Sequence, residues 1–214
     1  MIGSSRIVVA VFLAGLGTVM AVAPPVSAAE PTADSAAAPK SALPAPAPQA
    51  PAQTRRQKLD DLFARLAASA DADETNGIVA AIDRLDLESG SNTADFLMAR
   101  AIAALGTRNL ETAQTLLDKI VSLQPDWAGA WNRRATVRFM TGDDRGSMAD
   151  IARVLALEPR HVGALLGMGM ILERDGFRDQ ALRAYRRALE IAPKLASARV
   201  AADRLEAAVR GQSL

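Results

Sequence analysis

Few side chains in this chain of 214 residues could support catalysis. His161 is the only histidine and cysteine is absent, so a thiol nucleophile and a Cys/His metal site are both excluded. A catalytic serine would need His161 as its base, and we interpret the segment that contains His161 as a linker between helices. The sequence therefore predicts a protein that is not an enzyme and that needs no cofactor or metal.

Two further patterns resemble catalytic motifs only superficially. The glycine-rich run at residues 163–169 follows no strand and precedes no Lys-Ser/Thr pair, both of which a phosphate-binding loop requires. The acidic pairs at residues 60–61 and 143–144 are interpreted as helix caps and solvated carboxylates, because nothing in the sequence brings the two pairs together. Neither pattern supports an assigned reaction.

The elements that organise the chain are repeats of a constant length. Pro125, Pro159 and Pro193 are the only prolines after Pro51, and their positions are evenly spaced at intervals of 34. Small and large residues recur in the same register, and two such sets are Ala101, Ala135 and Gly169, and Leu117, Ile151 and Tyr185. A period of this length is typical of helical repeat architectures.

Each repeat is predicted to fold as two antiparallel helices. In the clearest copy, apolar residues recur at helical spacing from Leu165 to Leu172, Asp175 and Gly176 interrupt the pattern, and it resumes at Ala181. Small residues allow two helix backbones to approach closely, and large residues fill the space beside them. One helix pair cannot bury its apolar face alone, so the pairs must stack on each other.

The best copy resembles the tetratricopeptide repeat, whose pattern is W-x2-L-G-x2-Y, then A-x3-F, then A and P. The residues that carry the resemblance are Leu165, Met168, Gly169, Ala181, Tyr185, Ala188 and Pro193. The middle copy keeps Trp131 but has Arg134 and Arg138 where the family has leucine and tyrosine. The resemblance implies an all-α fold, a right-handed superhelical stack of antiparallel helix pairs (an α-solenoid), and a protein or peptide as partner.

The resemblance also implies a binding groove on the first helix of each repeat. The residues that it places there are Met98, Ile102, Asn132, Arg133, Thr136, Met140, Leu166, Met170 and Arg174. Asn132 can both donate to and accept from a peptide backbone, Arg133 and Arg174 can bind carboxylates, and methionines adapt to irregular apolar surfaces. The alternative is that the methionines pack in the core or lie beneath the N-terminal helices. The clamp by which some family members hold chaperone tails needs lysine and asparagine where this chain has Met98 and Ile102.

Residues 1–28 have the features of a secretory signal peptide. Arg6 gives a positive start, residues 7–23 are apolar, and Val26, Ser27 and Ala28 form a small-residue cleavage site. The alternative is an uncleaved membrane anchor, since the apolar run is close to the shortest membrane span. Residues 29–54 are rich in alanine and proline and are interpreted as a disordered linker, with a proline-rich ligand as the alternative.

The remaining chain is divided by the repeat period. Residues 55–93 form a degenerate leading helix pair or an N-terminal cap, and residues 94–127, 128–161 and 162–195 are the three repeats. Residues 196–214 form a capping helix and tail, because a stack needs a terminal element with a polar outer face.

Charge argues against nucleic acid as a partner. The chain has 25 basic and 24 acidic residues, and removal of residues 1–28 deletes one arginine and leaves 24 of each. A nucleic-acid partner demands a concentrated positive face. We therefore expect a non-catalytic adaptor exported to the bacterial periplasm, with no membrane span after signal cleavage and a protein or peptide as partner. The alternative is a structural protein that self-associates as a homo-oligomer.

Overall fold

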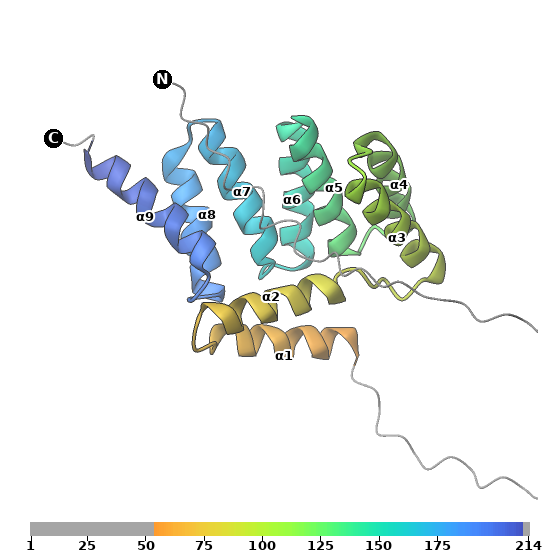
Figure 1. The fold of residues 1–214 in the computed structure, drawn as a ribbon, viewed down its shortest axis with the longest axis horizontal. Coiled ribbons are helices and arrows are strands. Elements are labelled where there is room, and N and C mark those ends of the chain that lie inside the picture. Colours follow the sequence, from red (N-terminus) through yellow and green to blue (C-terminus); the bar gives the residue numbers. More distant parts are fainter. Residues whose placement is uncertain (1–53, 212–214) are drawn as a thin grey trace, which may run out of the picture. The chain divides into compact units, whose positions relative to one another are not determined.

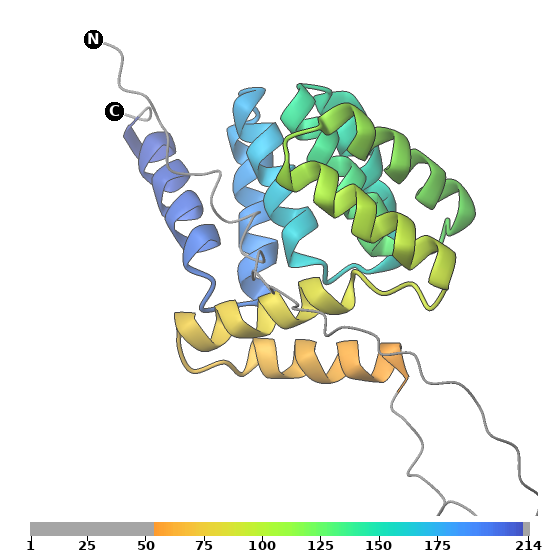
Figure 2. The same ribbon diagram turned by 45° about the vertical axis from the view of Figure 1, so that its right-hand side comes forward.

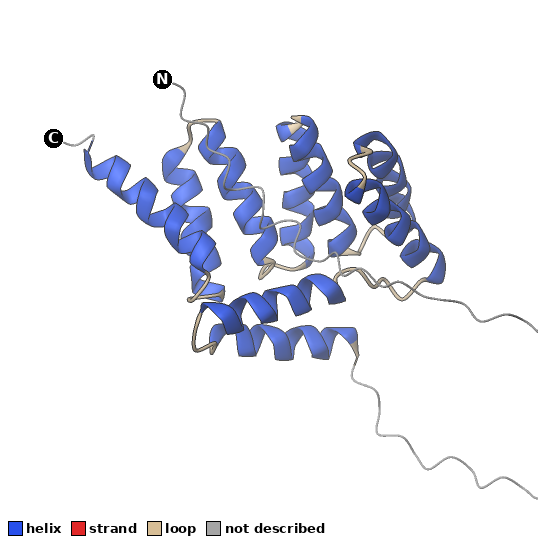
Figure 3. Cartoon of the chain, viewed as in Figure 1, coloured by secondary structure: helices blue, strands red, loops and turns tan. Residues whose placement is uncertain are grey.

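The computed structural model describes residues 54–211, and these residues pack as one unit. In this stretch the chain forms nine helices and no strand (Figure 1, Figure 3). The helices are α1 (Arg55–Ala67), α2 (Ala72–Leu85), α3 (Asn92–Gly106), α4 (Leu110–Leu123), α5 (Ala128–Thr141), α6 (Asp144–Leu157), α7 (Val162–Arg174), α8 (Arg178–Ile191) and α9 (Ala196–Gly211). Among them, none has the length and apolar character that a membrane crossing needs. The expected signal peptide at 1–28 and nearly all of the expected linker at 29–54 lie outside the described residues.

The helices from α3 onward stack as antiparallel pairs. α3 packs on α4, α5 on α6 and α7 on α8, and each second helix also packs against the first helix that follows it. Figure 1 shows the three pairs side by side, with α9 at the end of the row. The predicted all-α stack of antiparallel helix pairs is confirmed.

Proline sets the turn between consecutive units. α4, α6 and α8 each end two residues before a proline, and the residue between, such as Glu158 before Pro159, has left the helical conformation. This agrees with the steric preference of residues that precede proline. The regular turns place the first helices α5, α7 and α9 at equal intervals along the chain.

A buried ion network replaces apolar packing inside the middle repeat. Arg134 donates to both carboxylate oxygens of Asp150 at 2.7 and 2.9 Å, and Arg138 Nη1 lies 2.9 Å from the same carboxylate. Arg134 also donates to Asp118 on α4 at 3.0 Å. The Asp150 side chain is almost completely buried, so its charge is tolerable only because both guanidiniums face it. The network explains how the middle repeat accommodates two arginines at positions where the repeat pattern has leucine and tyrosine.

The N-terminal pair α1–α2 does not take the place of a repeat stacked before α3. It runs along the edge of the stack that the turns between units form (Figure 2). The apolar residues that join it to α7, α8 and α9 are Leu59, Phe63, Leu66, Ile78 and Ile82 on the pair and Val162, Leu165, Ala188, Ala192, Leu195 and Ala198 on the stack. Arg160, in the turn before α7, adds an ion pair to Asp60 at 2.7 Å and stacks on the Phe63 ring.

Asp86, the residue that follows α2 as its C-cap, joins the pair to two repeats. Its carboxylate lies 2.8 Å from Arg55 Nη2 and 3.2 Å from His161 Nε2, and its backbone oxygen accepts from Trp127 Nε1 at 2.9 Å. His161 is buried and its Nδ1 accepts from the Ala164 amide, which caps α7. The proton of the neutral ring is therefore on Nε2, the nitrogen that faces Asp86. The lone histidine thus has a structural role at this junction.

We predict that Asp150→Ala lowers the free energy of unfolding by about 3–5 kcal/mol, because it removes the buried carboxylate that Arg134 and Arg138 share and leaves them only the half-exposed Asp118 and Asp143. Asp118→Ala, the matched control at the half-exposed end of the network, should cost about 1 kcal/mol or less. The triple variant Arg134→Leu, Arg138→Tyr and Asp150→Leu should recover most of the loss, because apolar residues can replace a buried ion network. Urea unfolding measures all three, and equal losses for the two aspartate variants would contradict the assignment.

Gly129→Ala should loosen the N-terminal pair, because a Cβ at this position would overlap the backbone carbonyl of Asp86. We expect a loss of about 1–3 kcal/mol, the usual cost of overpacking. Gly77→Ala is the matched control, since a Cβ there meets no atom within 4 Å and alanine favours the interior of α2 by up to about 1 kcal/mol. Urea unfolding with limited proteolysis between α2 and α3 separates the two variants. The prediction fails if Gly129→Ala is as stable and as resistant as the parent.

Candidate protein-binding face

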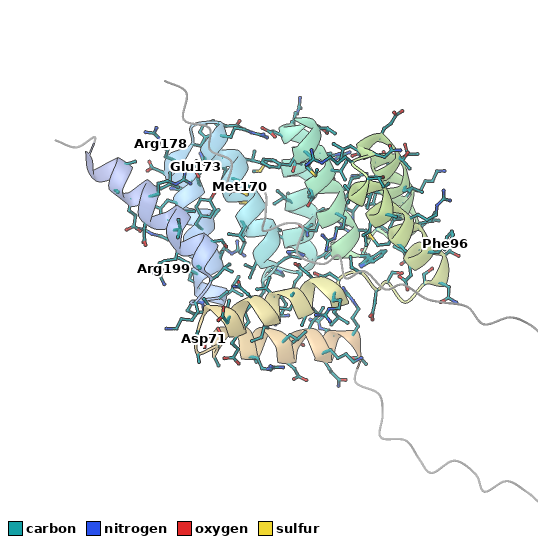
Figure 4. The ribbon with its side chains drawn as sticks, in the orientation of Figure 1. Asp71, Phe96, Met170, Glu173, Arg178 and Arg199 are labelled. Carbon is teal, nitrogen blue, oxygen red and sulfur yellow. The ribbon has the colours of Figure 1, made fainter. Side chains whose placement is uncertain are left out.

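The first helices α3, α5 and α7 present most of the predicted groove residues at the surface. Met140 and Arg174 are exposed, and the half-buried members are Ile102, Arg133, Thr136, Leu166 and Met170. Figure 4 shows Met170 on α7 with Glu173 one turn further along the helix. We call this set of seven residues the first-helix face, and its role in binding stays a prediction.

Two predicted groove residues are not available to a ligand. Met98 is 1% exposed and packs in the core formed by α3, α4 and α5. Asn132 is also buried, and its amide is directed toward the start of α7 near Gly163. The prediction that these two side chains line an open groove is wrong, because the core of α3, α4 and α5 covers Met98 and the start of α7 lies against Asn132. For Met98 the alternative of core packing is the correct one.

The cations of the first-helix face already have partners within the chain. Arg174 stacks on the Phe139 ring, with 4.4 Å between the guanidinium carbon and the ring centroid, and forms an ion pair with Asp144. Arg133 on α5 interacts electrostatically with Asp83 on α2. A ligand carboxylate would therefore have to compete with an internal one at either arginine. The side chains without such internal charge pairing are apolar or neutral, which favours apolar contacts over charge recognition.

Glu173, at the edge of the first-helix face, also has partners within the chain. Its carboxylate accepts from Arg204 on α9 at 2.9 Å and from the Tyr185 hydroxyl at 3.3 Å. Burial, together with the nearby negative charge of Glu173, raises the pKa of Tyr185 well above its ordinary value. The tyrosine therefore stays a neutral hydrogen-bond donor and has no acid or base role near neutral pH.

The contribution of α9 to this face was not predicted from the sequence. Val200 is exposed on α9 and stands one full repeat period after Leu166, so the helix assigned as a cap continues the series of first helices. The signal was present in the repeat period, which extends past Pro193 although no second helix follows α9 in the described residues.

No arrangement in the described part of the chain points to metal chemistry. Within residues 54–211 there is no group of three or more histidine, aspartate or glutamate side chains that could hold a metal ion. The groups with altered pKa values are paired with neighbouring charges or buried at helix contacts. Burial, for example, raises the pKa of Asp83, and the opposing charge of Arg133 offsets this only in part.

A protein of Rhizobium etli described as TPR repeat-containing is 42% identical to this chain over 138 residues. The match covers 64% of this chain and 68% of the relative. The chain belongs to the tetratricopeptide-repeat family. Tetratricopeptide repeat protein 36 of Bos taurus is 32% identical over 99 residues, which is 44% of this chain and 53% of the relative. No family model matches the chain.

Solved tetratricopeptide-repeat domains share the fold of the stack. The first such domain of Spaghetti (RPAP3), bound to the HSP90 peptide SRMEEVD, aligns with a TM-score of 0.53 and 18% identity over 55% of this chain and 93% of that one. The domain of Sgt2 from Aspergillus fumigatus gives a TM-score of 0.53 with 15% identity, over 57% and 83% of the two chains. The aligned share corresponds to about half of this tetratricopeptide-repeat chain.

Asp83→Asn should stabilise the protein at pH 7. Because burial raises the pKa of Asp83 in the folded state, its contribution to stability is complete below its unfolded pKa of about 4 and is lost as the pH rises through the folded value. Asparagine has no charge to bury, so its advantage should be present at pH 7 and disappear near pH 3. Thermal unfolding of parent and variant between pH 3 and 8 measures this difference, and an advantage that grows toward low pH would contradict it.

Proposed function

We propose that this tetratricopeptide-repeat protein is a non-catalytic adaptor of the cell envelope that binds a protein or peptide segment. The observation that carries the proposal is the first-helix face, in which exposed and half-buried apolar side chains follow one another across stacked helices. Membership of the family supports it, as does the domain of Spaghetti (RPAP3), which has the same fold and is bound to a peptide.

The chemistry of the face favours a segment with apolar side chains. Ile102, Met140 and Met170 supply adaptable apolar surface, and the nearby arginines are already paired with Asp144 and Asp83. Burial of apolar surface would then provide most of the binding free energy. The acidic chaperone tail is not proposed as the ligand, because this chain has methionine and isoleucine where that clamp needs lysine and asparagine.

The proposed location is the bacterial periplasm. It rests on the sequence of residues 1–28, which have a positively charged start, an apolar run and a small-residue cleavage site. After cleavage the protein would carry no membrane-spanning segment, and its balanced charge gives no basic surface for nucleic acid.

N-terminal sequencing of the protein from a periplasmic fraction should find Ala29 as the first residue. A full-length protein that stays in the membrane fraction would show that the apolar run is an anchor. A full-length protein in the cytoplasmic fraction would contradict export altogether. A chain without residues 1–28 is the control and should remain in the cytoplasm.

Met140→Glu with Met170→Glu should reduce ligand capture at least about tenfold, since a charge in an apolar contact costs more than about 1.4 kcal/mol. Leu123→Glu is the matched control, because Leu123 is an exposed aliphatic residue on α4 that lies outside the first-helix face. Quantitative crosslinking and capture from envelope extract compares the variants, and circular dichroism checks their folding. Unchanged capture by the double variant would contradict the assignment of this face. A stable dimer that buries the face would instead support self-association.

A further inference from the structure

The outer face of α3 is exposed, although the same face of every later first helix is buried. Phe96 is 62% exposed and Ala103, two turns further along α3, is also exposed. The residues one, two and three repeat periods later are all exposed to 3% or less, and they are Ala130, Ala164 and Ala198 for Phe96, and Val137, Ile171 and Leu205 for Ala103. Figure 4 shows Phe96 at the end of the stack that α3 forms.

In the later repeats a preceding second helix covers this face. Ala130 and Val137 pack with apolar residues of α4, and Ala164 and Ile171 pack with residues of α6. Among residues 54–211 α3 has no such neighbour, because α1–α2 lies along the turns and packs against α7, α8 and α9. By analogy with the later repeats, the element that fits the outer face of α3 is an amphipathic helix, packed as α4 packs on α5.

At the other end of the stack, α9 carries charged residues on the face where another helix could pack. On α9, the face where a further second helix would pair carries Arg199, Asp203 and Glu206, at the positions of Leu165, Gly169 and Leu172 in α7. A depression of about 350 Å³ between α8 and α9 is lined by these residues, and Arg186 bridges to Glu206 at 2.8 Å. The array is thus terminated by polar residues at α9 and left apolar at α3.

Arg100, which lies beside the exposed face of α3, indicates that a helix packed on this face would carry a negative charge. Arg134 on α5 pairs with Asp118 of the preceding helix α4 at 3.0 Å. Arg100 stands one repeat period before Arg134, is exposed, and has no ion-pair partner among the described residues. An incoming helix that packs in the same way would place a carboxylate beside Arg100.

Two candidates for the incoming helix come from this chain itself, α2 and the α3 helix of a second copy. Both place a cation beside Arg100. If α2 moved into the position of a stacked second helix, the residue in the register of Asp118 would be Arg84, which would repel Arg100. If two copies of the chain paired through α3 about a two-fold axis at the middle of the helix, Arg100 would lie near the Arg100 of the other copy, and this repulsion disfavours the pairing.

We propose that the outer face of α3 is a docking site for an amphipathic helix of a partner protein. The helix has a stripe of large aliphatic residues that covers Phe96, Ala99 and Ala103, and an acidic residue that pairs with Arg100. It takes the place of the second helix that the stack lacks before α3. This site is separate from the first-helix face and does not depend on the function proposed for that face.

The test uses the full chain and a probe taken from its own sequence, the α4 peptide Leu110–Leu123, which packs on the equivalent face of α5. A crosslink on its exposed side keeps it helical, because an isolated helix of this length is marginal in water. Fluorescence anisotropy should show saturable binding that Ala103→Arg or Phe96→Asp weakens at least about tenfold. Phe177→Asp, which changes an exposed aromatic residue between α7 and α8, is the matched control and should bind as the parent does.

A charge swap tests the ion pair. A peptide with Asp118→Arg should bind the parent at least about tenfold more weakly, and Arg100→Glu in the protein should restore its binding. The absence of saturable binding by the unmodified peptide, or the absence of rescue, would overturn the proposal. Loss of capture by the Met140 and Met170 variants with unchanged peptide binding would show that the two sites are distinct.

Thiol labelling and molecular mass test whether the outer face of α3 is instead covered by a segment of the same chain or by a second copy. The chain has no cysteine, so Ala99→Cys provides a single thiol on this face. We expect rapid thiol labelling and a monomeric mass by analytical ultracentrifugation. Slow labelling of a monomer would show that a segment of the chain covers the face, and a dimer abolished by Ala103→Arg would show that a second copy does. Either result would overturn the proposal.

Discussion

The structure depends on the inability of a single helix pair to bury its own apolar surface. Each first helix of the stack has two apolar contacts to satisfy, one with its own second helix and one with the second helix before it. Small residues at the contact allow this, as where Gly169 lies against the Tyr185 ring and leaves no room for a side chain. The same constraint links the fold to its interactions, because any first helix without a preceding neighbour exposes an apolar face.

The middle repeat satisfies this constraint by a different route. Arg134, Arg138 and Asp150 are charged where repeats of this kind use apolar contacts, and the three form hydrogen bonds inside the protein. Such a network adds little net stability, but it disfavours every other register of α5 on α6, because displacement would leave a buried charge unpaired. The repeat with the most altered sequence pattern is therefore held in register by specific polar contacts.

The sequence predicts the stack well because its signal is local and periodic. The proline spacing marks the turns, and the small residues mark the close contacts within each pair. Asp150 could not be interpreted from the repeat pattern. It is a single aspartate at a position where the pattern expects an apolar residue, and the sequence does not indicate that it pairs with Arg134 and Arg138. Met98 and Asn132 show another limit, because the repeat pattern identifies the positions on the first helix but not how closely neighbouring helices approach.

The position of α1–α2 could not be predicted from the period. Its helices have ordinary amphipathic patterns, but their partners lie far along the chain, as with Asp60 and Arg160. No short-range pattern records that distance. The contacts at Asp86 depend on Trp127 and His161, which single-sequence reasoning assigns to turns.

The placement of α1–α2 along the turns has a mechanical consequence. A simple helical array behaves like a spring, because each unit touches only its neighbours and can bend or unfold with little effect on distant units. Here the beginning of the described chain is fastened to the last repeat and the final helix. The packing of α1–α2 on the last repeat and α9 therefore resists stretching and twisting of the stack. It also requires contacts between residues far apart in the sequence, and such contacts slow folding. The described helices are therefore expected to unfold together rather than one repeat at a time.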